Sequence, residues 1–210
     1  NTKALCEVMG MGCETDAYDP MEKAMLKHCK ILGFSNEYLF GGEMIREYAF
    51  TNELKMMGHI WRRDDGITIA AKGSPERILA ICELTNLEKQ VAEQKITEMS
   101  KQGLRVIAVA TAKPQSEAEV PAQITDCRLT LCGLIGLADP PRESVKADIA
   151  VCNKAGIRVV MITGDNGITA ASIAKKIGMQ NSDHIITGDM LNEMTDEELR
   201  EKVKDVSIFS

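Results

Sequence analysis

From residue 129 onward, short apolar runs alternate with amphipathic segments along the chain. The runs span 129–137, 157–162, 184–187 and 206–209, and the segments between them carry apolar residues at helical spacing. Gly156 and Gly178 stand where the first two helices are expected to end, since glycine accepts the left-handed conformation there. This alternation predicts βαβ units on a parallel sheet, which binds ligands beyond the carboxyl ends of its strands.

The earlier part of the chain has a different pattern. Residues 56–63 and 66–72 are strand-like, and the Asp-Asp-Gly between them favours a hairpin. A charged helix over 87–102 and a strand over 106–111 follow, and the proline-containing stretch 113–123 is typical of a linker. The expected fold class is α/β overall, with an antiparallel α+β domain over 1–125 and a parallel α/β domain over 126–210.

Composition excludes several classes of protein. The formal net charge is −6, which argues against a nucleic-acid-binding face. No apolar run approaches the roughly 20 residues of a membrane helix. Seven cysteines without a CxxC pair predict free thiols in a reducing cytosol, and the three histidines have no ligand spacing, so no metal site is expected. The first residue is Asn, not Met, which favours a fragment of a longer protein.

Two segments of the second half have residues suited to chemistry. Segment 163–166, Thr-Gly-Asp-Asn, follows a strand and opens a helix, which fits either a phosphate site or an ordinary N-cap on Asp165 or Asn166. Segment 139–142, Asp-Pro-Pro-Arg, sets a carboxylate and a guanidinium around a rigid bend. For this segment the residues alone favour a strand end with proline at the first helical position.

Two segments of the first half could contact a nucleotide. Lys72 and Gly73 end a strand, where a lysine can meet phosphate and a glycine permits close approach. Phe50 could stack on a purine with Lys55 nearby, although a core phenylalanine is the simpler interpretation. Segment 64–68 lies in the predicted turn and is not interpreted as a nucleophile loop.

The order of these motifs resembles that of P-type cation-transporting ATPases, over essentially all 210 residues. The order is Lys-Gly-Ser-Pro-Glu at 72–76, Gly-Leu-Arg at 103–105, Asp-Pro-Pro-Arg at 139–142 and Met-Ile-Thr-Gly-Asp-Asn at 161–166. The calcium-pump-like branch is the most similar, through Phe50, the Lys-Met-Met at 55–57 and the acidic segment 19–22.

The resemblance implies roles for individual residues. It implies a nucleotide-binding (N) domain over 1–125 and a partial, haloacid-dehalogenase-like phosphorylation (P) domain over 126–210. The adenosine and phosphate cleft would be lined by Glu22, Phe50, Lys55, Lys72, Gly73 and Arg105. Asp139, Arg142, Thr163, Gly164 and Asp165 would belong to the P domain, where Asp139 and Arg142 would help to bind the nucleotide. Thr163, Gly164 and Asp165 would form the phosphoryl site, with Thr163 and Gly164 holding the transferred group.

The implied ligand is ATP, with Mg²⁺ used only in the parent pump. The implied partners are the pump's transmembrane and actuator domains, at the cytoplasmic face of a membrane that this piece does not itself contact.

Two departures limit what the chain alone is expected to do. The Asp-Lys-Thr-Gly-Thr motif, whose aspartate takes the phosphate, and the Gly-Asp-Gly-x-Asn-Asp motif, whose aspartates hold Mg²⁺, are both absent from the 210 residues. Ser74 replaces the usual alanine, and Asn52 and Glu53 stand where related pumps tend to carry basic residues. The alternatives are a noncatalytic nucleotide-binding or interaction module and a haloacid-dehalogenase-type phosphatase. The transported cation is not encoded in this segment.

Overall fold

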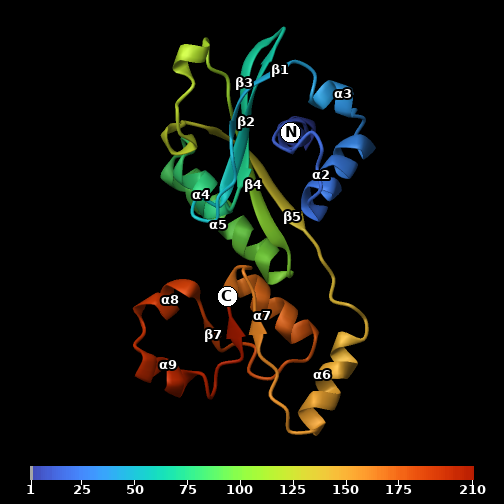
Figure 1. The fold of residues 1–210 in the computed structure, drawn as a ribbon, viewed down its shortest axis with the longest axis vertical. Helices are drawn as coiled ribbons and strands as arrows, with labels where there is room; N and C mark the ends of the chain where they lie inside the picture. The colour runs from blue at the N-terminus through green and yellow to red at the C-terminus, as the bar shows by residue number, and fades with distance from the viewer. Residues whose placement is uncertain (1) are drawn as a thin grey trace. The chain divides into compact units, whose positions relative to one another are not determined.

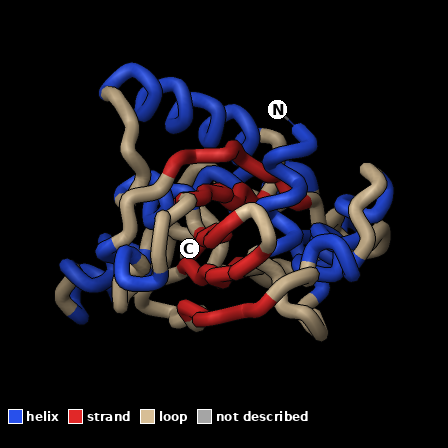
Figure 2. The backbone as a smooth tube through the Cα atoms, turned by 90° about the horizontal axis from the view of Figure 1, so that it is seen from above, coloured by secondary structure: helices blue, strands red, loops and turns tan. Residues whose placement is uncertain are grey.

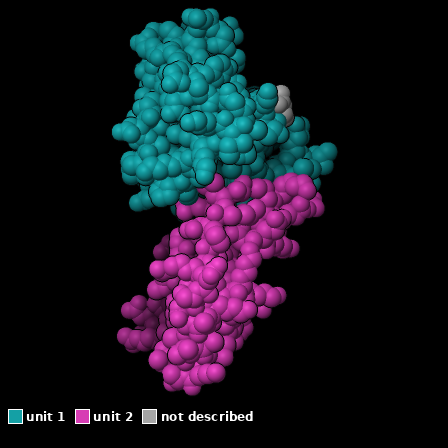
Figure 3. All heavy atoms as spheres, turned by 90° about the vertical axis from the view of Figure 1, so that its right-hand side faces the viewer, with its two compact units in different colours: residues 1–93, 106–135 teal, residues 94–105, 136–210 magenta. Residues whose placement is uncertain are grey.

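The computed structural model describes residues 2–210 and divides into two compact units (Figure 3). The first unit consists of residues 1–93 and 106–135, and the second of residues 94–105 and 136–210. The chain therefore leaves the first unit and returns to it once. Both units combine helices with strands, which confirms the α/β class.

The first unit is built on a five-stranded sheet in the order β1-β2-β3-β4-β5 (Figure 1). Its strands are β1 (Glu43–Tyr48), β2 (Met56–Arg63), β3 (Gly66–Gly73), β4 (Arg105–Ala112) and β5 (Thr130–Leu137). Strands β1 to β4 pair antiparallel with their neighbours, and β2 and β3 form the predicted hairpin around Gly66, whose φ is 113°. The antiparallel sheet predicted for the first half is thus confirmed.

The two faces of this sheet have separate cores, because successive strand residues point to opposite sides. On one face, Trp61 and Ala70 pack with Met11 of α1 (Thr2–Met11). On the other, Ile60 and Ile69 pack with α4 (Pro75–Ala80) and with the segment 120–129. The remaining helices of this part are α2 (Pro20–Ile31) and α3 (Asn36–Leu39), with short 3-10 turns at Glu117–Glu119 and Ile124–Asp126. Helix α5 (Asn86–Lys101) begins in the first unit and ends in the second.

The second unit contains a three-stranded parallel sheet in the order β6-β8-β7. Its strands are β6 (Met161–Ile162), β7 (Ile185–Ile186) and β8 (Ile208–Phe209), and its helices are α6 (Val145–Lys154), α7 (Gly167–Lys176), α8 (Gly188–Glu193) and α9 (Asp196–Lys202). Figure 2 shows the strands in red among the blue helices. The predicted helix ends are confirmed, since Gly156 and Gly178 have φ values of 73° and 80°. The capping box of Thr195 and Glu198 is also present.

One strand differs from expectation. The apolar run around 129–137 was expected to open the parallel half, but β5 belongs to the five-stranded sheet. A continuous apolar run indicates a strand without indicating its partners, so its sheet is decided by distant residues. The boundary between the N and P domains near residue 125 stays a prediction.

Two further expectations from composition can be compared with the structure. All seven cysteines are free, and Cys6, Cys13, Cys29 and Cys127 are buried. Among residues 2–210, no helix has the length and apolar character needed to cross a bilayer.

Candidate functional site

A buried ion pair lies between the first helices and the hairpin of the first unit. Lys72 Nζ is 2.6 Å from Glu22 Oε1, and both residues are less than one-tenth exposed. The ammonium also contacts the carbonyl oxygen of Gly12 and, at 3.2 Å, the sulfur of Met57. Burying two charges is costly unless they are paired and hydrogen-bonded, and here both conditions are met.

Local sequence signals position both members of the pair. Asp19 caps α2 by accepting hydrogen bonds from the backbone amides of Met21 (2.8 Å) and Glu22 (3.2 Å), which fixes Glu22 in the first turn. Lys72 lies near the end of β3, directly opposite Met57 of β2. The contact of Lys72 with Met57 could have been expected from the hairpin pairing. Its contact with the Gly12 carbonyl could not, because nothing in the sequence indicates it.

Phe50 is 55% exposed, so its interpretation as a core residue is wrong. It lies in the connection between β1 and β2, which ends in a turn where the Lys55 amide donates to the Thr51 carbonyl at 2.8 Å. Lys55 is exposed and has a φ of 53°, an uncommon conformation for a residue with a side chain. The connection thus offers an unpacked aromatic ring and an ammonium group near the start of β2.

Gly73 joins these features at one end of the hairpin. It pairs with Met56, and the next amide, of Ser74, donates to the Lys55 carbonyl at 2.8 Å. A Cβ on Gly73 would lie 2.5 Å from Met56 Cβ and 2.6 Å from the Lys55 oxygen, closer than any side chain tolerates. Only glycine therefore fits between Lys72 and the turn at Lys55.

Arg105 and Asp165 meet in the second unit. The Arg105 guanidinium is 3.7 Å from the Asp165 carboxylate, and both side chains are partly solvent-exposed. Of the two caps considered for α7, the structure has Asn166, whose side chain accepts from the Ile168 amide at 2.9 Å. The Thr163 hydroxyl accepts from the Asp165 amide at 3.1 Å, and a Cβ on Gly164 would meet nothing within 4 Å. Segment 163–166 therefore forms an open turn at the carboxyl end of β6.

Asp139 and Arg142 are exposed in the segment that follows β5. Their expected position at a helix start is wrong by several residues, because α6 begins at Val145 and Pro141 is not its first residue. No contact links either side chain to segment 163–166 among the interactions of the described residues.

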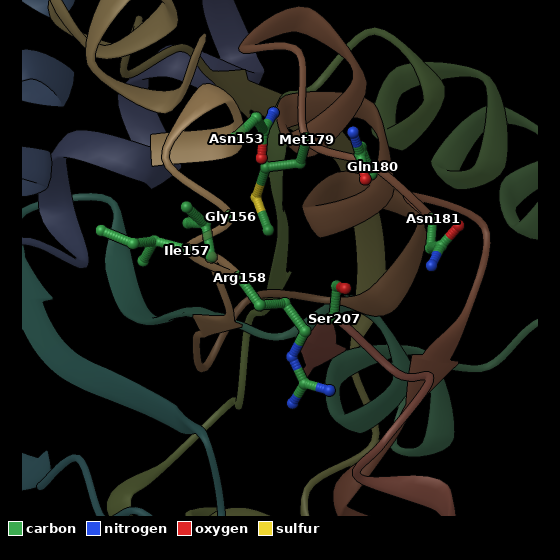
Figure 4. Close-up of a pocket in the computed structure, with 9 residues that line it drawn as sticks. Asn153, Gly156, Ile157, Arg158, Met179, Gln180, Asn181 and Ser207 are labelled. Atoms are coloured by element: carbon green, nitrogen blue, oxygen red, sulfur yellow. The ribbon is translucent and has the colours of Figure 1, made fainter. Parts of the chain in front are cut away.

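A hollow of about 210 Å³ lies in the second unit, away from these residues (Figure 4). It is lined by Gly156–Val159 before β6, by Met179–Asn181 and by Ser207 before β8. These positions are at the amino ends of the parallel strands, whereas ligands in such sheets bind at the carboxyl ends. The hollow is therefore not the site that segment 163–166 would form.

The residues thus fall into two groups. In the first unit, the Lys72–Glu22 pair, Gly73, Lys55 and Phe50 lie at one end of the hairpin. They offer one exposed ring and one exposed ammonium group, on Lys55, while the Lys72 ammonium is neutralised by Glu22. Such a set can stack a planar base and attract an anion. In the second unit, Thr163, Gly164, Asp165 and Arg105 form a polar turn that can receive an anionic group.

Comparison with known proteins gives a consistent family. The sequence model of the protein family described as P-type ATPase, cytoplasmic domain N, matches residues 9–144. The chain is 36% identical over 205 residues to calcium-transporting ATPase 1 of Lactococcus lactis, covering 91% of this chain and 23% of the relative. It is 36% identical over 206 residues to a calcium-transporting ATPase of Bacillus subtilis, with the same coverage.

A sodium/potassium exporting P-type ATPase of Schizosaccharomyces pombe is 32% identical over 225 residues, covering 94% of this chain and 22% of the relative. The chain therefore spans about a quarter of the length of the curated relatives it matches. Because relatives named for different cations match at similar identity, the comparison supports the calcium-pump branch only loosely.

Proposed function

The chain belongs to the P-type ATPases, and from that premise we propose that it is the ATP-binding segment of a cation pump. The parent would couple ATP hydrolysis to cation transport and use Mg²⁺, with this segment at the cytoplasmic face of the membrane. Its partners would be the transmembrane and actuator domains of the same pump. The transported ion is left open, because its ligands would lie on membrane helices.

The observation that carries the proposal is the exposed ring of Phe50 at the same end of the hairpin as the buried Lys72–Glu22 pair. An exposed phenylalanine is a good stacking surface for a base. Lys72, Glu22 and Gly73 would form the polar side of the adenine site. Lys55 would lie toward ribose and phosphate. The resemblance also assigns Arg105 to the adenosine and phosphate cleft, and this assignment stays a prediction.

The second unit would be part of a haloacid-dehalogenase-like phosphorylation domain. Thr163 and Gly164 would hold the transferred phosphoryl group through a hydroxyl and an amide, and Asp165, Asp139 and Arg142 would surround it. Its small parallel sheet and the open turn after β6 are compatible with this role.

ATP titration of the chain and of Phe50→Ala tests the adenine site. Removing a stacking ring costs about 1–3 kcal/mol, so we expect ATP affinity to fall about 5- to 150-fold by calorimetry. Tyr18→Ala is the matched control, because Tyr18 is an exposed aromatic residue of the same unit, 83% accessible. Equal ATP affinity in the parent chain and Phe50→Ala would refute the assignment.

The isolated chain is further expected to bind ATP without hydrolysing it. Phosphoryl transfer in this family needs an aspartyl nucleophile and bound Mg²⁺, and the motifs that supply them are absent from the sequence. Asp165 is not expected to substitute, since it lies outside the Asp-Lys-Thr-Gly-Thr motif and its carboxylate already faces Arg105 at 3.7 Å. Incubation with γ-labelled ATP checks this. An acid-stable phosphoprotein that disappears in Asp165→Asn would overturn it.

A further inference from the structure

His59 lies on the face of the sheet that packs against α1, and its ring has one nitrogen without a partner. The side chain is fully buried. Its Nδ1 is 3.2 Å from the carbonyl oxygen of Met11, which also accepts a hydrogen bond from Trp61 Nε1 at 2.8 Å. Its Nε2 is buried and has no hydrogen-bond partner among residues 2–210. A buried polar atom without a partner is costly, so its presence requires an explanation.

The contact with Met11 determines which nitrogen carries the proton. A carbonyl oxygen only accepts hydrogen bonds, so Nδ1 must donate, and neutral His59 then presents a lone pair at Nε2. An imidazole whose other nitrogen donates to a backbone carbonyl is the usual arrangement of a metal-binding histidine, because that bond fixes the ring.

Two carboxylates lie close to the His59 ring. Glu47 of β1 lies directly opposite His59 in the β1–β2 pairing, and Glu14 follows α1. The ligand atoms of the three side chains all lie within 4.8 Å of one another. Glu14 Oε1 is 3.9 Å from Nε2, too far for a hydrogen bond. One ring nitrogen and two carboxylate oxygens therefore lie close enough together for a single cation to be held among them.

We propose that His59, Glu14 and Glu47 bind a divalent first-row transition metal ion, for which Zn²⁺ is the best match. One imidazole nitrogen and two carboxylate oxygens suit Zn²⁺, whereas Mg²⁺ and Ca²⁺ prefer oxygen ligands alone. Three protein ligands leave a further position for water, and the partial exposure of both carboxylates gives the ion a path from solvent.

The neighbouring thiol does not belong to the site. Cys13 precedes Glu14, but its side chain is fully buried, and its sulfur donates to the Met9 carbonyl at 3.3 Å. The thiol is therefore already engaged by a carbonyl of α1 and is not counted among the ligands. The proposed metal site uses none of the side chains of the Lys72–Glu22 pair. The two are neighbours, because the Glu14 backbone amide donates to Glu22 Oε2 at 3.3 Å.

Calorimetric titration with Zn²⁺, without nucleotide, tests the proposal on the 210-residue chain. Glu47→Gln and Glu14→Gln keep the shape of each side chain and remove its charge. We expect each to weaken Zn²⁺ binding by about tenfold or more, since even outer-sphere changes cost this much. The matched controls are Glu43→Gln, on the same strand as Glu47 but paired with Arg62 at 2.6 Å, and His28→Gln, an exposed histidine of α2.

Co²⁺ provides a second readout, because its visible spectrum distinguishes thiolate from nitrogen and oxygen ligands. We expect a spectrum without thiolate bands that is lost in Glu47→Gln. His59 is fully buried, so a substitution there would affect folding as well as metal binding. The decisive variant is therefore Glu47→Gln, because Glu47 is exposed. The proposal would be overturned if the unchanged chain does not bind Zn²⁺. It would also be overturned if Glu14→Gln and Glu47→Gln bind Zn²⁺ as tightly as the unchanged chain.

Discussion

At the scale of single residues, the Lys72–Glu22 pair is expected to dominate the effect of mutations near the candidate site. Lys72→Ala would leave the Glu22 carboxylate buried without its partner, which costs about 3–5 kcal/mol of unfolding free energy. Urea denaturation followed by circular dichroism measures this loss. Lys113→Ala is the control, because that lysine pairs with Asp65 at the surface, and such pairs contribute about 1 kcal/mol or less.

Comparing Lys72→Met with the double variant Lys72→Met/Glu22→Gln separates the loss of a partner from the loss of volume, because both keep a long side chain at position 72. Removing both charges leaves no buried unpaired ion, so we expect most of the stability lost in Lys72→Ala to return. A Lys72→Ala variant as stable as Lys113→Ala would show that water reaches the Glu22 carboxylate, contrary to its burial here. These measurements need no nucleotide and so test the pair independently of the proposed function.

At the scale of elements, the start of α7 gives a prediction that the sequence left undecided. Asn166, not Asp165, accepts the hydrogen bond that caps the helix. Asn166→Ala is therefore expected to destabilise the second unit by about 1 kcal/mol, and Asn166→Asp by much less, since aspartate caps equally well. Asp165→Ala removes only a partly exposed ion pair and should cost less than Asn166→Ala. Thermal unfolding of the three variants checks the order, and a larger loss in Asp165→Ala would contradict it.

The elements that the sequence predicted correctly are those with local signals. The β2–β3 hairpin follows from its turn residues, and the ends of α6 and α7 follow from Gly156 and Gly178. The partners of β5 were not predictable, because they are chosen by packing between distant residues. Helix α1 was not among the predicted elements, and it contains Gly10, a poor helix former. A Cβ on Gly10 would lie 2.7 Å from Leu39 Cδ1, so packing requires glycine there.

The candidate sites follow the same division. The resemblance to the family identified Lys72 and Glu22 as cleft residues. Their direct pairing joins residues 50 positions apart, so only the three-dimensional structure could reveal it. The exposure of Phe50 reversed the interpretation favoured by its residue type. Glu14, Glu47 and His59 come from three separate segments, so no spacing in the sequence could have indicated that they meet.

At the scale of the whole molecule, the two units are expected to differ in stability. Strands β2 and β3 are eight residues long and have buried side chains on both faces. Strands β6, β7 and β8 contain two residues each, so few backbone hydrogen bonds join them, and their core is formed by a small cluster around Ile208. Local opening costs least where buried apolar contacts and backbone hydrogen bonds are few.

Amide hydrogen exchange of the 210-residue chain measures this difference directly. We expect the amides of β2 and β3 to exchange only through global unfolding, and those of β6, β7 and β8 to exchange faster through opening of the second unit alone. The comparison should be made at the same pH and temperature, and Asn166→Ala should accelerate exchange in α7 without changing exchange in β2. Slower exchange in β6–β8 than in β2 and β3 would contradict the prediction, because two-residue strands would then be stabilised by contacts beyond their own unit.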